Sequence, residues 1–179
     1  PYDCGYAIVR DADAHRRAMT AAASYLPVGG ANERDPSHLT PELSRRARGF
    51  ATWAIIRHLG RQGIADMVAR HCRCARLMAE RLARESGVEI VNDVELNQVI
   101  VRFAAGETPE RSDALTQAVI ARVQNDGICF VAGARWGGQW VMRLSVISWL
   151  TDEEEAIRSA EAIVGAWQAV RSDTFQSAG

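Results

Sequence analysis

The sequence predicts an α+β fold in which a helical connector precedes a small domain with a mainly antiparallel sheet and helices on one face. Three observations favour this class. Apolar residues recur at helical spacing through residues 40–86, and the apolar runs become short and strand-like after Gly87. The Gly137-Gly138 pair then separates two such runs as a hairpin turn does. The resulting order of elements after residue 87, β-β-α-β-β-α, is typical of helices packed against one face of an antiparallel sheet.

The first half of the chain should be mainly helical. Residues 4–10 (CGYAIVR) predict a short apolar strand, and residues 11–23 predict a short helix or turn. Residues 26–40 contain two prolines and a Gly-Gly pair, which indicates a long loop. We expect one helix from Thr40-Pro41, with the threonine as its cap, to Gly60. A second helix should run from about residue 64 to residue 86 and stop at Gly87.

The second half predicts strands and helices in alternation. The expected strands are residues 88–91, 99–103, 128–132 and 140–147. Ser112 should cap a helix that reaches about residue 125. Thr151 and Glu154 have the spacing of a capping box, so a last helix should begin there and end near residue 170.

Composition excludes several classes of function. Hydrophobic residues make up 47% of the chain and charged residues 24%, and the net charge is −1. These values are ordinary for a globular protein and give no electrostatic reason to expect nucleic acid or an anionic membrane as a partner. No apolar run is long enough to span a membrane, and no signal pattern opens the chain, so we expect a cytoplasmic location.

The four cysteines do not indicate a metal site or a disulfide framework. They stand at positions 4, 72, 74 and 129, an irregular spacing in a chain without a secretory signal. Cys72 and Cys74 lie next to His71, but no second ligand pair follows at a zinc-like spacing. We therefore predict free thiols, buried or half-buried, and no metal.

Two features of the sequence are unusual. All 21 basic residues are arginine, so the chain contains no lysine. The chain also begins with Pro-Tyr-Asp and runs directly into an apolar segment, which we interpret as an internal cut in a longer protein.

Four segments carry a resemblance to a known family. They are PYDCGYAIVRD at the start, Tyr25-Leu26, SRRARGFATWAIIRHLGRQGIADMV at residues 44–68, and VMRLSVISWLTDEEE at residues 141–155. Together they resemble the group II pyridoxal-phosphate decarboxylases, a family that includes aromatic-amino-acid and glutamate decarboxylases. The resemblance follows the family's order along nearly the whole chain and is strongest over residues 1–70. It implies part of a fold type I enzyme, pyridoxal 5'-phosphate as cofactor, an amino acid as substrate and a homodimer when complete.

The same resemblance explains in part why the chain has no lysine. In the family, the segment His-Lys-Trp, whose lysine amine links covalently to the cofactor, lies a few residues before Pro-Tyr-Asp-Cys. Arginine cannot replace that amine, because it does not deprotonate to a nucleophile in proteins. This chain alone should therefore be inactive, unless a separate upstream chain supplies the lysine.

We assign residues 1–40 to the end of the large cofactor domain and a mobile loop, 41–87 to the connector, 88–172 to the small domain and 173–179 to a tail.

The loop at residues 26–40 is the first candidate part of a site. It resembles a loop in which aromatic-amino-acid decarboxylases place a proton-donating tyrosine. That position falls on Pro36, which has no proton to give and so argues against ordinary amine formation. His38 and Tyr25 are the candidate catalytic residues instead, because an imidazole or a phenol can transfer a proton. The alternatives are a solvated loop histidine and a tyrosine that packs the end of a short helix.

Three further candidates bind rather than react. Ser44, expected in the first turns of a helix, matches a family position that approaches the cofactor phosphate of the neighbouring subunit. Arg143 shares a strand face with Val141 and Ile147, so we do not expect it to face solvent fully. Related enzymes use an arginine on the corresponding strand to hold the substrate carboxylate, and a structural ion pair is the alternative. Tyr2 is a candidate aromatic wall of the substrate site.

The leading hypothesis is a pyridoxal-phosphate-dependent carboxy-lyase of aromatic or other bulky L-amino acids. Two alternatives remain open. An enzyme on the same framework can run transamination or oxidative deamination, and the chain can be a non-catalytic folded fragment that acts as an association module.

Overall fold

The computed structural model describes residues 4–20, 35–104 and 106–176. The chain folds as two compact units, Pro1–Gly60 and Arg61–Gly179. In the part of the chain that is described, no helix is both long enough and apolar enough to cross a membrane.

The first unit has no core of its own among its described residues. It contains helix α1 (Ala12–Met19), capped by the Asp11 carboxylate, which accepts a hydrogen bond from the Ala14 N–H at 2.8 Å, and a short 3₁₀ turn, η1 (Pro36–His38). No described residue of this unit is buried. The strand expected at residues 4–10 does not form, and Ile8 is 99% exposed. The reason is that a strand requires a hydrogen-bonded neighbour, and the described part of this unit offers none.

Helix α2 (Gly49–Ala83) corrects the expected helix start. It begins at Gly49 rather than at Thr40, whose hydroxyl donates to the Glu42 carbonyl at 3.0 Å instead of accepting from a backbone N–H as a cap would. The break expected at Gly60 is confirmed, since its φ of 64° and ψ of −175° interrupt the helical geometry. Glycine suits this position because such backbone angles are strained for residues with a Cβ.

A four-stranded sheet forms the centre of the second unit. Its strands are β1 (Val88–Ile90), β2 (Gln98–Phe103), β3 (Ala132–Trp136) and β4 (Gln139–Ser145). They lie in the order β1-β2-β4-β3, and every neighbouring pair is antiparallel. Gly137 and Gly138, with φ of 57° and 84°, form the β3–β4 turn, which confirms the expected hairpin.

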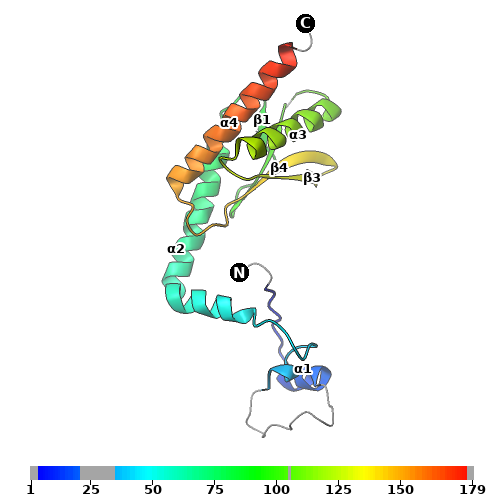
Figure 1. Cartoon of the computed structure of the whole chain (residues 1–179), viewed down its shortest axis with the longest axis vertical. Helices are drawn as coiled ribbons and strands as arrows, with labels where there is room; N and C mark the ends of the chain where they lie inside the picture. Colours follow the sequence, from blue (N-terminus) through cyan, green and yellow to red (C-terminus); the bar gives the residue numbers. More distant parts are fainter. Residues whose placement is uncertain (1–3, 21–34, 105, 177–179) are drawn as a thin grey trace. The chain divides into compact units, whose positions relative to one another are not determined.

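One hydrophobic core joins the sheet to three helices. Helix α3 (Pro109–Asp126) and helix α4 (Glu153–Gln176) lie over the sheet (Figure 1), and the second half of α2 contributes to the same core. The sheet contributes alternate residues, which strand geometry places on one face: Val99, Val101, Phe103, Met142, Leu144 and Val146. The predicted α+β class, with an antiparallel sheet and helices on one face, is confirmed.

Several element boundaries in this unit differ from the expected ones. Thr108, not Ser112, caps α3, while Ser112 is buried and its hydroxyl donates to the Phe103 carbonyl at 2.6 Å. Asp152, not Thr151, caps α4 by accepting from the Glu155 N–H at 2.9 Å, and α4 continues to Gln176. Residues 128–131 precede β3 rather than belonging to it, because β3 pairs with β4 only from Ala132 onwards.

Candidate functional site

Arg143 lies in the middle of β4, on the sheet face that the helices leave open. Its Cα partners are Ile100 on β2 and Ala132 on β3. Contrary to expectation, the side chain is exposed, even though Val141 on the same strand face is only 1% exposed. Among the described residues Arg143 has no polar partner, so the alternative of a structural ion pair finds no support there.

His38 ends the 3₁₀ turn that begins at Pro36, the position where a proton-donating tyrosine is expected. The turn is capped by Asp35, whose carboxylate accepts from the Ser37 N–H at 2.8 Å, and the His38 N–H donates to the Asp35 carbonyl at 3.1 Å. These Ser37 hydrogen bonds, and to a smaller degree the charge of His38, hold the pKa of Asp35 below its ordinary value. The half-buried imidazole of His38 therefore lies in an ordered turn. The residue before it, Ser37, donates its N–H to the ionised carboxylate of Asp35.

Ser44 is not in a helix. It is exposed and lies five positions before Gly49, where α2 begins. The expected placement of Ser44 in the first turns of a helix is therefore wrong, because the helical N–H groups begin several residues later. A cofactor role for Ser44 remains a prediction that rests on the resemblance alone. Tyr2 and Tyr25 lie outside the described residues.

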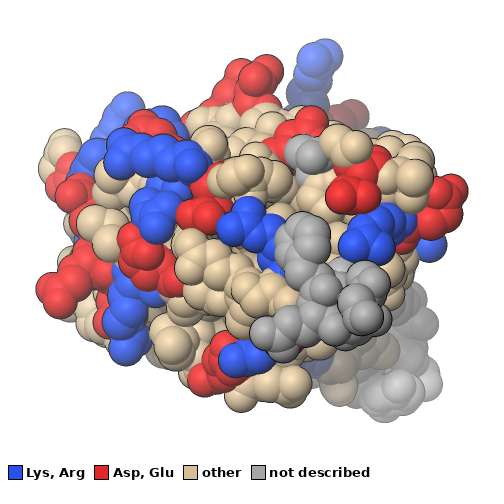
Figure 2. Space-filling view, turned by 90° about the horizontal axis from the view of Figure 1, so that it is seen from above, with Lys and Arg blue, Asp and Glu red and all other residues tan. Residues whose placement is uncertain are grey.

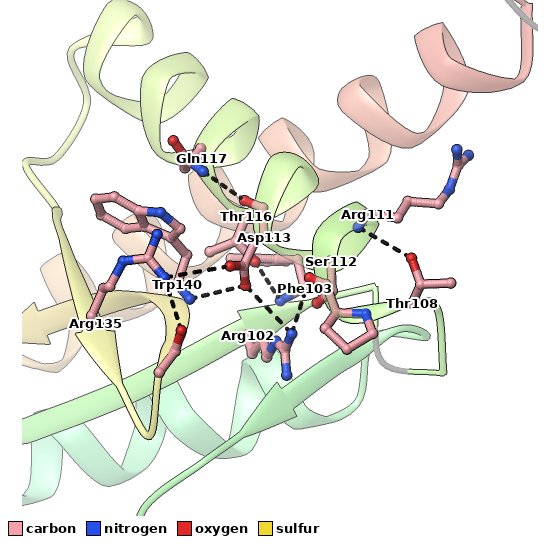
Figure 3. A network of polar contacts seen from close by, with 12 residues as sticks. Arg102, Phe103, Thr108, Arg111, Ser112, Asp113, Thr116, Gln117, Arg135 and Trp140 are labelled. Atoms are coloured by element: carbon pink, nitrogen blue, oxygen red, sulfur yellow. Dashed lines mark hydrogen bonds and ion pairs between the residues drawn. The ribbon is translucent and has the colours of Figure 1, made fainter.

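A network around Asp113 is a polar cluster that the sequence did not indicate. Figure 3 shows the Asp113 carboxylate facing the backbone of Trp140 and the guanidinium groups of Arg102 and Arg135. It accepts from the Trp140 N–H at 2.9 Å and lies 3.5 Å from Arg102 Nη2 and 3.9 Å from Arg135 Nη1. Asp113 thereby joins the first turns of α3 to the end of β2 and the β3–β4 hairpin. Nothing local to Asp113 in the sequence indicates these partners.

Two adjacent residues of α2, Arg70 and His71, form a second missed cluster. Arg70 donates to the carbonyls of Trp149 (2.6 Å) and Thr151 (3.2 Å), and His71 Nε2 lies 2.9 Å from the Ser148 carbonyl. Because a carbonyl oxygen only accepts, Nε2 of His71 carries a hydrogen. The local sequence around His71 does not indicate this contact, because Ser148 lies 77 positions away.

The cysteines are free thiols, as predicted. Cys72 and Cys74 are buried, and Cys4 and Cys129 are half-buried. Burial raises the pKa of Cys74 and of Cys129, so these thiols stay protonated and are poor nucleophiles. No group of three potential metal ligands occurs among the described residues.

Charged side chains of both signs lie on the surface of the structure. Figure 2 shows arginines and acidic side chains interspersed over the face that is drawn, rather than gathered into a patch of one sign. The exposed ion pairs on the helices, such as Arg122–Asp126 and Arg158–Glu155, have the same mixed character.

The residues present fit a pyridoxal cofactor only in part. The chain has no lysine, so none of its side chains can form the covalent link to a pyridoxal aldehyde. What the described residues can supply is a free guanidinium at Arg143 and an imidazole at His38. The first suits a carboxylate and the second a proton transfer.

Comparison with known proteins identifies the family of this chain. The model of the pyridoxal-dependent decarboxylase conserved domain matches residues 1–104. The 4-hydroxyphenylacetaldehyde synthase of Rhodiola rosea is 26% identical over 152 residues, which cover 84% of this chain and 31% of the synthase. Tyrosine decarboxylase 1 of Narcissus pseudonarcissus is 25% identical over 179 residues, covering 94% of this chain and 33% of the relative.

Solved structures share the fold. A crystal structure of Oryza sativa TDC with PLP and tryptamine matches with a TM-score of 0.77 at 21% identity, over 86% of this chain and 33% of that one. The chain thus spans about a third of the length of the proteins it matches. Because the family model covers more than half of the chain, the chain belongs to the pyridoxal-dependent decarboxylase family.

Proposed function

We propose that this chain is the C-terminal part of a pyridoxal-phosphate-dependent carboxy-lyase that acts on an aromatic or other bulky L-amino acid. The observation that carries the proposal is the family match over residues 1–104 together with the shared fold of the second unit. Relatives named as tyrosine and tryptophan decarboxylases support the aromatic substrate class. The complete enzyme is then a cytoplasmic homodimer, and the isolated chain is inactive because it has no lysine.

Arg143 is the proposed ligand of the substrate carboxylate. Its guanidinium is exposed and free of polar partners among the described residues, while the backbone below it is fixed by strands on both sides. A planar guanidinium can donate two parallel hydrogen bonds to a carboxylate, and such charge-assisted bonds contribute about 1.5–3 kcal/mol. Replacing Arg143 by leucine in the complete enzyme should raise KM more than it lowers kcat. Replacement by lysine keeps the positive charge but not the planar guanidinium that can donate two parallel hydrogen bonds, so it should restore binding only in part.

His38 is the proposed proton donor, with Tyr25 as the second candidate. His38 is held in the turn that also contains Pro36, the position of the family tyrosine. A His38→Ala variant of the complete enzyme should lose amine formation while it still consumes substrate. His58, on α2, provides a matched control histidine, and His58→Ala should leave the product ratio unchanged. Unchanged amine formation in His38→Ala would reject His38, and the same test then applies to Tyr25→Phe. Ser44 and Tyr2 are proposed to contact the cofactor phosphate and the substrate, respectively.

Oxidative deamination is the second candidate function, and Pro36 is the observation that favours it. Without a donor at this position, the carbon left after loss of CO₂ is not protonated to give an amine. With dioxygen as the oxidant and water as co-reactant, the amino acid would then give an aldehyde, ammonia, CO₂ and hydrogen peroxide. Relatives named as acetaldehyde synthases occur in both Rhodiola rosea and Drosophila melanogaster.

Product analysis of the complete enzyme decides between the two. Amine and CO₂ without oxygen consumption support the carboxy-lyase, while aldehyde, ammonia and peroxide support oxidative deamination. A Pro36→Tyr variant should shift the ratio toward amine in the second case. Borohydride treatment followed by intact mass measurement would detect a pyridoxyl adduct on any chain that binds the cofactor. If no adduct is found and neither reaction occurs, the non-catalytic association module is the correct alternative.

A further inference from the structure

Strand β4 pairs with its two neighbouring strands over different stretches. It pairs with β2 through residues 142–145 and with β3 through residues 139–143. Among the described residues of β4, only Met142 and Arg143 therefore have a strand on both sides. The β3–β4 hairpin extends beyond them without a strand partner on the β2 side. Its angle relative to β2 must therefore be fixed by something other than the strand ladder.

Side chains of α3 take the place of the missing ladder. The register of β2 and β4 would place Phe103 opposite Trp140, but the two strands are not paired there. Instead, the Trp140 N–H donates to Asp113 Oδ1 at 2.9 Å, and the Phe103 N–H donates to Thr116 Oγ1 at 3.2 Å. The Phe103 carbonyl accepts from the Ser112 hydroxyl at 2.6 Å (Figure 3). These side chains satisfy backbone groups that the separated strands would otherwise leave without partners.

Asp113 contacts all three strands around this gap. Besides the Trp140 N–H of β4, its carboxylate lies 3.5 Å from Arg102 Nη2 of β2 and 3.9 Å from Arg135 Nη1 of β3. The Arg135 guanidinium also donates to the Gly138 carbonyl at 2.8 Å and lies 5.2 Å from the centroid of the Trp140 ring, which stiffens the hairpin. One carboxylate thus ties the hairpin to β2.

The gap lies next to Arg143. The Arg143 guanidinium has no polar partner among the described residues, so its direction follows from the backbone of β4. Trp140 lies three positions before it on the same strand, and Arg143 belongs to the two-residue stretch about which the hairpin could rotate. Because the guanidinium ends a long side chain, a small rotation of the backbone displaces it further. A misplacement of about 1 Å in an active site can cost about 100-fold in rate.

We propose that Asp113 is a positioning residue that directs Arg143 toward the substrate carboxylate. It holds the Trp140 N–H and so fixes the angle of the β3–β4 hairpin, and it acts through Arg143 rather than by contact with substrate. This inference rests on the proposed function, because it uses Arg143 as the ligand of that carboxylate. It predicts that loss of Asp113 weakens recognition of one group of the substrate rather than the whole site.

Kinetics of the complete enzyme test this role with L-tyrosine, the amino acid in the name of one relative, and with tyramine, which lacks the carboxylate. Asp113→Ala should raise the KM of L-tyrosine about tenfold, with a smaller change in kcat, because it weakens binding of the carboxylate. The inhibition constant of tyramine should stay within about twofold of the parent value, because tyramine has no group for Arg143 to hold. A KM within about twofold of the parent value, or an equal rise in both constants, overturns the proposal.

Three further variants separate positioning from stability. Gly87→Ala, which brings a new Cβ to 3.0 Å from Trp167, should also destabilise the fold but leave the KM of L-tyrosine unchanged. Asp113→Asn keeps an oxygen that can accept the Trp140 N–H, so it should restore much of the parent KM. If Gly87→Ala raises the KM as much as Asp113→Ala does, the effect is general destabilisation and the proposal is rejected. If Asp113→Ala does not fold, Asp113→Glu takes its place. Its carboxylate lies one methylene farther out, so the KM should rise severalfold, and an unchanged KM rejects the proposal.

A double-mutant cycle with Arg143→Leu tests whether Asp113 acts through Arg143. In the Arg143→Leu background, Asp113→Ala should raise the KM no further, because the guanidinium that it positions is gone. The same fold-change in both backgrounds rejects this inference and leaves the proposed function intact. If Arg143→Leu alone leaves the KM of L-tyrosine unchanged, the proposed carboxylate role of Arg143 is wrong, and this inference is rejected with it.

Discussion

Replacing Asp113 by alanine should destabilise the second unit more than any exposed charge substitution. The carboxylate accepts the Trp140 N–H at 2.9 Å, and its side chain is 21% exposed. Losing a hydrogen bond to a charged group costs about 1.5–3 kcal/mol. The pair with Arg102, whose side chain is 12% exposed, is shielded from water, whereas the 3.9 Å pair with Arg135 is exposed and contributes little. We expect a total loss of about 2–4 kcal/mol in the free energy of unfolding.

Asparagine at the same position separates the two contributions. Asp113→Asn keeps an oxygen that can accept the Trp140 N–H but removes the charge opposite Arg102, so it should cost about half as much as alanine. Asp126→Ala, which removes an exposed pair with Arg122 on the same helix, is the control and should cost at most about 0.5 kcal/mol. Urea denaturation followed by circular dichroism measures all three. An Asp113→Ala variant no less stable than Asp126→Ala would refute the role of Asp113 in holding α3 against the sheet.

Three other substitutions or conditions give sharp expectations. Gly87→Ala should cost about 2–4 kcal/mol, because φ is +80° and the new Cβ would lie 3.0 Å from Trp167; a thermal melt within a degree of the parent would contradict this. The hydrogen bond from Arg81 lowers the pKa of Glu161, so its stabilisation is present above the unfolded pKa and is lost as the pH falls through the folded value. Titration by NMR should show the Glu161 pKa rising in Arg81→Ala. Burial raises the pKa of Cys74, so iodoacetamide should label it only after unfolding at neutral pH, and rapid labelling of the folded chain would be inconsistent with that burial.

Much of the second unit could be predicted from residue patterns because its signals are local. The Gly137-Gly138 turn needs only two residues without a Cβ between two apolar runs, and both residues do adopt positive φ. The strand near residues 99–103 and the helices on both sides of it likewise follow from short-range periodicity. The break at Gly60 is another local effect, since glycine can adopt backbone angles that other residues avoid.

The helix caps show where local reasoning fails. Ser112, Thr40 and Thr151 all have side chains that can cap a helix, but each is used differently or not at all. The Ser112 hydroxyl instead donates a hydrogen bond to the Phe103 carbonyl, which is nine positions away in the sequence and is brought close by the fold. A residue type with several possible partners is assigned by whichever partner the tertiary structure supplies.

The sequence by itself determined the α+β class, the hairpin, the absence of lysine and the resemblance to a decarboxylase family. All of these depend on composition or on neighbours within a few positions. Only the tertiary structure decided that Arg143 is exposed, that Asp113 joins three elements, and that Arg70 and His71 hold a segment 77 to 81 positions away. The physical reason is that burial and charge pairing depend on which distant backbone groups meet, and that is settled when the helices and the sheet pack around one core.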